Sequence, residues 1–139
     1  MSRINCIPPR ELSGPHLVAE YRELPRVFGM MRRKQAQGLL PATLRLPRQY
    51  CFGTGHVSFF LDKGGWLLRR QHALIREMQR RGYHPTFTDP ATLAAGLDPA
   101  WLGHWRPTPA ARALNRRRIA ERARLSRRSR QAARPPRTV

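Results

Sequence analysis

The stretch SGPHLVAEYRELPRVFGMMRRKQAQG, residues 13–38, decides the fold of this chain, because it predicts one long helix. Apolar side chains recur there at steps of three and four residues, the spacing of a single helical face: Leu17, Tyr21, Leu24 and Phe28. Ser13 is a suitable N-cap residue, and Gly38 is a suitable C-terminal stop. The helix is therefore expected to bury one face against the rest of the chain.

The centre of this stretch combines a proline with a small charged cluster. Pro25 lacks a backbone N–H, so it should kink the helix. Glu23 stands between Arg22 and Arg26. One interpretation is a solvated ion pair between Glu23 and Arg26, three residues apart on an exposed helix face. The other is a carboxylate that acts on a negatively charged partner.

A second helix is expected over residues 63–81, stopped by Gly82. Its buried stripe consists of apolar residues at helical spacing: Leu67, Leu74, Ile75 and Met78. The opposite side is predicted to expose its basic residues: Arg69, Arg70, Arg76, Arg80 and Arg81.

The segments around these helices read as irregular. Residues 1–10 are expected to form an extended arm, because two consecutive prolines disfavour a helix there. Residues 39–62 and 83–107 are rich in proline and glycine and are predicted to be loops. Trp101 and Trp105 should pack the second of these loops onto the helices.

A third helix is predicted for TPAARALNRRRIAERARL, residues 108–125. Thr108 is a good N-cap, and Pro109 stands at the first helical position, where proline is tolerated. From residue 112 onward the chain has 11 arginines and one acidic residue, and residues 126–139 offer little to bury. No segment alternates as a strand would. We therefore predict an all-α chain: a single compact domain of three main helices with an extended N-terminal arm over residues 1–125, and a basic, disordered tail over residues 126–139.

The charge of the chain points to a polyanionic partner. The 139 residues include 27 Lys and Arg against 8 Asp and Glu, a net charge of +19. A charge of this sign and size is typical of proteins that bind nucleic acid. A membrane surface fits less well, because no helix pairs a basic face with a clean apolar one. Only Lys34 and Lys63 are lysines; the arginine bias suits phosphate binding, and it also fits the coding bias of a GC-rich genome.

Several classes of site are missing from the sequence. No phosphate-binding GxxxxGK[ST] loop and no GxSxG nucleophile motif is present. Cys6 and Cys51 form no CxxC pair, and the five histidines are scattered, so neither a metal nor another cofactor is expected. Two reduced thiols and the lack of a signal segment predict a cytoplasmic protein, associated with the nucleoid through DNA. A monomer is expected, because no apolar stripe is left over once the helices pack.

The N-terminus offers amine chemistry. Ser2 is small enough for removal of Met1, which would leave a free α-amine. Such an amine has a pKa of about 8, against about 10.4 for lysine, so more of it is a neutral nucleophile near pH 7. It could attack a sugar C1′ and form a Schiff base, with a nearby carboxylate to stabilise the cationic intermediate. Many proteins also begin with Met-Ser for processing reasons alone.

Four segments resemble the pyrimidine-dimer DNA glycosylase family, which includes the phage ultraviolet-repair enzyme called endonuclease V: SRIN at 2–5, HLVAEYRELPRVFG at 16–29, GTGHVSFF at 53–60 and RRGY at 80–83. The resemblance extends from residue 2 to about residue 125. It implies three main helices with the arm threaded between them. It also implies an enzyme that binds cyclobutane pyrimidine dimers in duplex DNA, breaks the 5′ glycosidic bond and cleaves the resulting abasic site by β-elimination.

The same resemblance implies roles for individual residues. The nucleophile would be the α-amine of Ser2, and the essential carboxylate would be Glu23. The residues expected to contact DNA are the following: Arg3, His16, Arg22, Arg26, Arg118 and Arg122. The C-terminus departs from the phage relative, because its last residues contain no aromatic side chain and offer only charge. A non-catalytic basic DNA- or RNA-binding protein that has kept the fold is the alternative, and charge alone fits both.

Overall fold

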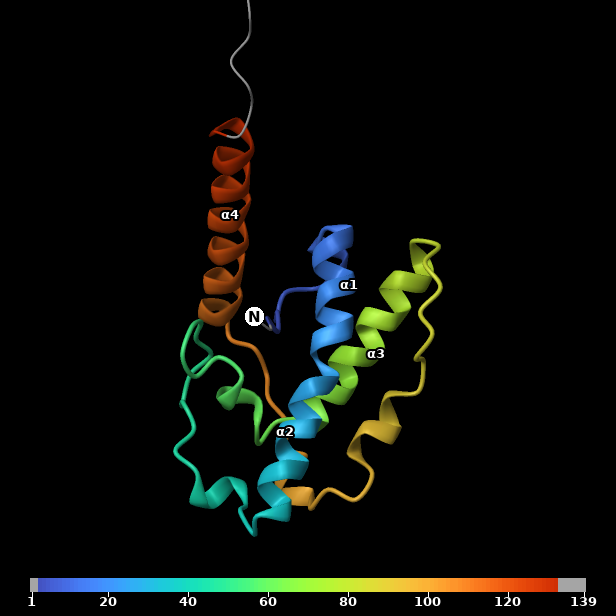
Figure 1. The fold of residues 1–139 in the computed structure, drawn as a ribbon, viewed down its shortest axis with the longest axis vertical. Helices are drawn as coiled ribbons and strands as arrows, with labels where there is room; N and C mark the ends of the chain where they lie inside the picture. Colours follow the sequence, from blue (N-terminus) through green and yellow to red (C-terminus); the bar gives the residue numbers. More distant parts are fainter. Residues whose placement is uncertain (1–2, 133–139) are drawn as a thin grey trace, which may run out of the picture.

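The described part of the chain, residues 3–132 of a computed structural model, is built from helices and loops (Figure 1). The α-helices are α1 (Gly14–Glu23), α2 (Pro25–Ala36), α3 (Gly64–Arg80) and α4 (Pro109–Ala132). Short 3-10 helices lie between them: η1 (Pro9–Glu11), η2 (Pro41–Thr43), η3 (Ser58–Phe60), η4 (Pro90–Ala94) and η5 (Pro99–Trp101). Within residues 3–132 the only β pairing is one isolated bridge. The predicted all-α class is confirmed, with α1 and α2 together forming the first of three main helical segments.

The expected kink occurs at Leu24, between α1 and α2. Leu24 keeps a helical backbone, and its N–H still donates to the Glu20 carbonyl at 2.9 Å. Pro25 has no N–H to offer the Tyr21 carbonyl one turn earlier. The buried side-chain amide of Gln71, on α3, donates to that carbonyl at 3.0 Å instead. The two helices can therefore bend without leaving a buried carbonyl unpaired.

The predicted N-caps of the first and third helices and the glycine stop of the second helix are also confirmed. The Ser13 hydroxyl accepts from the His16 N–H at 3.3 Å, and the Thr108 hydroxyl accepts from the Ala111 N–H at 3.0 Å. At the end of α3, Gly82 adopts φ +86° and lets the Tyr83 N–H reach the Met78 carbonyl at 2.9 Å. Residues that have a side chain rarely adopt a positive φ, which explains why a glycine occupies this position.

The core lies between α1, α2 and α3 and continues under the loop that contains residues 50–61. The predicted apolar stripe of α3 is buried, and Trp101 is fully buried beside it. Aromatic rings pack edge-to-face or stacked in one cluster: Tyr50, Phe59, Phe60, Trp66 and Trp105. This cluster attaches the irregular segments to the helices, as expected for Trp101 and Trp105.

The prediction that Arg70 belongs to the exposed face of α3 is wrong. Its side chain is only 6% exposed and forms an ion pair with the fully buried carboxylate of Glu20, with 2.7 Å between Nε and Oε2. Its Nη1 also donates to the Ile7 carbonyl at 2.5 Å. Helical spacing could not reveal this, because the partner that stabilises a buried arginine lies 50 residues away in the sequence.

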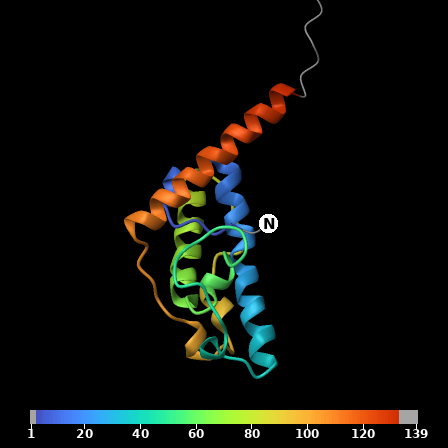
Figure 2. The same cartoon turned by 90° about the vertical axis from the view of Figure 1, so that its left-hand side faces the viewer.

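The third main helix is longer than predicted. We expected it to end near residue 125, but α4 continues through Ala132, and its C-terminal half extends beyond the rest of the molecule (Figures 1 and 2). The predicted disordered tail therefore differs from the structure over residues 126–132, while residues 133–139 lie outside the described part. Arginine, alanine and glutamine, which make up most of residues 126–132, favour a helix, so the expectation of disorder from charge and low apolar content was wrong there. No helix within residues 3–132 is long and apolar enough to cross a membrane.

Candidate active site

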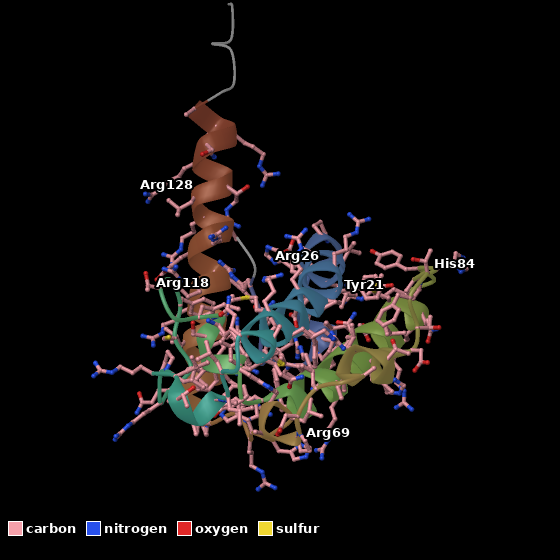
Figure 3. All side chains as sticks on the ribbon, turned by 60° about the horizontal axis from the view of Figure 1, so that its bottom comes forward. Tyr21, Arg26, Arg69, His84, Arg118 and Arg128 are labelled. Atoms are coloured by element: carbon pink, nitrogen blue, oxygen red, sulfur yellow. The ribbon has the colours of Figure 1, made fainter. Side chains whose placement is uncertain are left out.

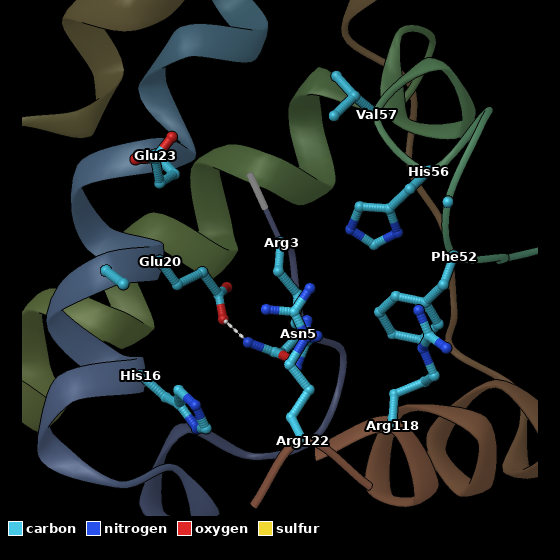
Figure 4. A pocket seen from close by; sticks show the side chains of 12 residues that line it. Arg3, Asn5, His16, Glu20, Glu23, Phe52, His56, Val57, Arg118 and Arg122 are labelled. Carbon is cyan, nitrogen blue, oxygen red and sulfur yellow. Dashed lines mark hydrogen bonds between the residues drawn. The ribbon is translucent and has the colours of Figure 1, made fainter. Parts of the chain in front are cut away.

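A pocket opens between the N-terminal arm, α1, the loop at residues 52–57 and α4 (Figure 4). Each of these elements supplies polar or aromatic side chains to it. The full lining is Arg3, Asn5, His16, Ala19, Glu20, Glu23, Phe52, Gly53, His56, Val57, Arg118 and Arg122. Helix α1 forms one wall, the loop forms the opposite wall, and the arm runs between them (Figure 4).

Five of the eight residues predicted for the site come together in this pocket: Arg3, His16, Glu23, Arg118 and Arg122. They come from the arm, from α1 and from α4, which are far apart in the sequence. Ser2 lies outside the described residues, but its neighbour in the sequence, Arg3, lines the pocket. Arg22 and Arg26 are exposed and are not part of the lining.

Glu23 takes part in both arrangements that the sequence allowed. Its carboxylate lies 3.0 Å from Nη1 of Arg26, the ion pair expected for a solvated helix face. It also lines the pocket, and its side chain is 25% exposed, against 72% for Arg26. The carboxylate is thus shared between the pocket and an exposed arginine.

Positive charges outnumber negative ones in the pocket, where three arginines and two glutamates line it. Burial lowers the pKa of Arg3, and the neighbouring charges of Arg122 and Arg118 lower it further. The pKa of His16 is lowered by burial first, and then by Arg3 and Arg122. A histidine whose pKa is below its usual 6.5 is mostly neutral near pH 7. The pocket therefore suits an anionic ligand, and it disfavours further positive charge on groups inside it.

Phe52 is a feature of the pocket that the sequence analysis missed. Its ring stacks on His56, with 4.9 Å between centroids and an interplanar angle of 10°. The guanidinium carbons of Arg3 and Arg118 lie 5.4 and 5.3 Å from the centroid of the same ring. These cation–π contacts connect the arm and α4 through the loop.

A buried polar network below the pocket was also missed. The Asn5 amide donates to Oε1 of Glu20 at 2.7 Å, as the dashed line in Figure 4 marks. The Asn115 amide in turn donates to Oδ1 of Asn5 at 2.7 Å. Asn5 and Asn115 are 110 residues apart. Two isolated asparagines in a sequence contain no signal of such a contact.

The described residues show no cluster of at least three His, Cys, Asp or Glu that could hold a metal ion. The expectation that the protein needs no metal or other cofactor stays a prediction.

Comparison with known protein families places this site in a class. Residues 1–91 of the 139 match the family model described as pyrimidine dimer DNA glycosylase, so the chain belongs to that family. The class is that of DNA glycosylases, which act on damaged DNA. The match covers the arm, α1, α2 and α3, and hence Arg3, His16 and Glu23, whereas Arg118 and Arg122 of α4 lie beyond it.

Proposed function

We propose that this protein excises cyclobutane pyrimidine dimers from duplex DNA through an imine to the α-amine of Ser2, and then nicks the abasic site by β-elimination. The observation that supports this most directly is the pocket itself. It combines Glu23 with the guanidinium groups of Arg3, Arg118 and Arg122, and Arg3 is the residue next to Ser2. DNA that already contains an abasic site is a second substrate under this proposal.

The first step replaces the glycosidic bond with a bond to the protein. The neutral amine of Ser2 attacks C1′ of the 5′ pyrimidine nucleotide, and the electron pair of the C1′–N1 bond leaves with the base, which takes up a proton. The new amine loses a proton, the C1′–O4′ bond opens, and O4′ is protonated. The result is a protonated imine between C1′ and the protein. The positive pocket favours the neutral, reactive amine at the start of this step.

The second step cuts the strand. A proton leaves C2′, and the electron pair forms a C2′–C3′ double bond as the C3′–O3′ bond breaks and the phosphate departs. The protonated imine withdraws electrons and makes the C2′ proton acidic. Glu23 would stabilise the cationic intermediate and move protons in both steps. Hydrolysis of the imine then releases the sugar and restores the amine.

The arginines would divide the binding of the phosphates. Arg3, Arg118 and Arg122 would hold those next to the damaged nucleotide, together with neutral His16. Arg22 and Arg26, exposed at the end of α1 and the start of α2, would contact phosphates outside the pocket. Guanidinium groups bind phosphate oxygens in pairs and keep their charge at any relevant pH. We also propose that the protein acts as a monomer on cytoplasmic, nucleoid DNA.

Borohydride trapping tests the proposal. The mature protein is incubated with a duplex that has one cyclobutane thymine dimer, or with one that has a plain abasic site, and mass spectrometry locates the cross-link. We expect a reduced adduct at Ser2 with both duplexes. An adduct with the abasic duplex alone would support a lyase with a different lesion preference.

A protein that retains Met1 is the matched control, since it differs only in which residue bears the amine. We expect it to form no adduct. If it reacts as well as the mature protein and the cross-link lies on a lysine, the nucleophile is that lysine, with Lys34 and Lys63 as the candidates. If neither protein reacts, while both bind duplex DNA tightly and in a salt-sensitive way, the non-catalytic alternative is correct.

A further inference from the structure

The N-terminal arm is held by side chains rather than by a helix or a strand. The Ile4 N–H donates to Nε2 of His56 at 2.8 Å, and the Tyr50 hydroxyl donates to the Ile4 carbonyl at 2.9 Å. Both polar groups of the Ile4 backbone are therefore bonded to the loop at residues 50–56. Ile4, Tyr50 and His56 are all buried, so water does not compete for these bonds.

Helix α4 holds the next part of the arm. Oδ1 of Asn115 accepts from the N–H of Cys6 at 2.8 Å and from the N–H of Ile7 at 3.3 Å. Asn115 is fully buried. The arm thus has a fixed register from residue 4 to residue 7. Within residues 3–132, the bond from Ile4 to His56 is the hydrogen bond of the arm backbone that lies nearest to the N-terminus.

The hydrogen bonds of His56 determine its tautomer. Its Nδ1 lies 2.6 Å from the Cys51 carbonyl, which can only accept, so Nδ1 has the proton. Its Nε2 faces the Ile4 N–H, which can only donate, so Nε2 is the acceptor. Burial is the largest effect and lowers the pKa of His56; it outweighs the hydrogen bond to Cys51, which raises it. A neutral ring with this tautomer is therefore the stable state near pH 7.

We infer that His56 is a positioning residue for the reaction, which sets how far the N-terminal amine reaches into the pocket. This inference rests on the proposed function. His56 anchors the backbone of Ile4, two residues from Ser2, and its ring is also the surface on which Phe52 stacks. Without this acceptor, the Ile4 N–H loses its hydrogen bond, and the Ile4 backbone is held by the Tyr50 hydroxyl alone. A displacement of about 1 Å in a reacting group can slow a reaction by about 100-fold.

Two substitutions separate the acceptor from the ring. His56→Phe keeps an aromatic ring against Phe52 but offers the Ile4 N–H no acceptor. His56→Gln loses the ring, but its amide oxygen can reach about as far as Nε2 and accept from the same N–H. We expect the rate of adduct formation at Ser2 on saturating abasic duplex to fall about 10- to 100-fold for His56→Phe. For His56→Gln we expect most of that rate to return. His72→Gln, at an exposed position of α3, is the matched control and should keep the rate of the unmodified protein.

The dissociation constant for the same duplex is measured alongside. We expect it to change by less than about threefold in all three variants, because none of the substitutions removes an arginine that would bind the phosphates. Equal losses of binding and trapping in His56→Phe, or a trapping rate equal to that of the unmodified protein, would overturn the inference. A failure of His56→Gln to recover, with an unchanged unfolding midpoint, would overturn the role of the acceptor.

Amide hydrogen exchange provides a readout that does not depend on the reaction. We expect the amide of Ile4 to exchange faster in His56→Phe, and to be protected again in His56→Gln, while α3 stays unchanged. If the unmodified protein forms no adduct at all, the proposed function fails. If the Ile4 amide exchanges equally slowly in the unmodified protein and in all variants, His56 does not anchor the arm, whatever the reaction rates are.

Discussion

At the scale of single residues, Glu23 has two competing environments. Its ion pair with Arg26 involves an arginine that is 72% exposed, and such pairs contribute little to stability. A DNA phosphate could therefore take over Arg26 at little cost, which would leave the carboxylate to the pocket. Glu23 is both paired with Arg26 and part of the pocket lining, so a substitution at this position tests whether the carboxylate takes part in the reaction.

We expect Glu23→Gln to bind abasic duplex normally and to lose the reaction. The amide keeps the shape of the side chain but can neither stabilise a cation by charge nor accept a proton, and we expect trapping to slow by about 100- to 10,000-fold. Glu11→Gln is the matched control: it removes the same charge from an exposed acid paired with Arg116, outside the pocket. Parallel losses of binding and trapping in Glu23→Gln would count against a catalytic carboxylate.

At the scale of elements, α4 combines two different parts. Its first turns contain the buried Ala111 and Asn115, and Asn115 attaches the helix to the arm. Its last turns are exposed and extend away from the molecule, with side chains such as Arg128 pointing outward (Figure 3). Arginines three or four residues apart repel one another along this surface, as Arg124 and Arg128 do. Phosphates beside them would remove that repulsion.

We expect these last turns to add phosphate contacts without affecting the chemistry. The test variant replaces four arginines with glutamine, which has a similar helix propensity. The replaced residues are Arg124, Arg127, Arg128 and Arg130. Each phosphate contact contributes about 0.9 to the slope of log K against log salt, so we expect the slope to become shallower by about 1 to 4. Trapping at saturating DNA should not change.

The matched control for this experiment removes four exposed arginines elsewhere: Arg33, Arg45, Arg48 and Arg69. If both four-arginine variants change the salt slope equally, the slope depends on the net charge of the protein and not on the position of the arginines on α4. Binding constants for duplex DNA, measured for both variants from 50 to about 300 mM salt, give the two slopes.

At the scale of the whole molecule, charged side chains connect the arm to the helices. Arg81, just after α3, donates through Nε to Oε1 of Glu77. Through Nη2 it donates to the carbonyls of Pro9 and Leu12. Hydrogen bonds from Arg80 first, and from Arg81, hold the pKa of Glu77 at about 2, below its ordinary 4.5. Because this pKa is lower in the folded state, ionised Glu77 stabilises the fold above about pH 4.5, and the contribution is lost as the pH falls towards 2.

We expect Glu77→Gln to unfold more easily than the unmodified protein at pH 7, and this difference to shrink between about pH 5 and pH 2. Urea unfolding midpoints measured over that range test it. Glu121→Gln removes an exposed carboxylate that lies 3.7 Å from Arg118, and it serves as the control for charge. A difference for Glu77→Gln that is constant with pH would mean that its ionisation does not stabilise the fold.

The sequence by itself determined the three main helical segments and their ends, except the last, where α4 continues to Ala132. The stripe of residues at helical spacing, the caps at Ser13 and Thr108 and the glycine after α3 are local features, and local geometry is enough to form them. The same is true of the kink at Pro25. The sequence also determined the net charge of +19 and the motifs that match the family.

Only the tertiary structure decided which of these residues meet. The buried partners of Arg70 and Asn115 lie 50 and about 110 residues away, and no spacing rule connects them. The fold also separated Arg22 and Arg26 from the pocket and added Phe52 and His56 to it. The physical reason is that helix formation depends on neighbours along the chain, whereas residues 3–8 of the arm form no regular structure of their own. Their polar groups must find partners wherever the packing of the other elements provides them.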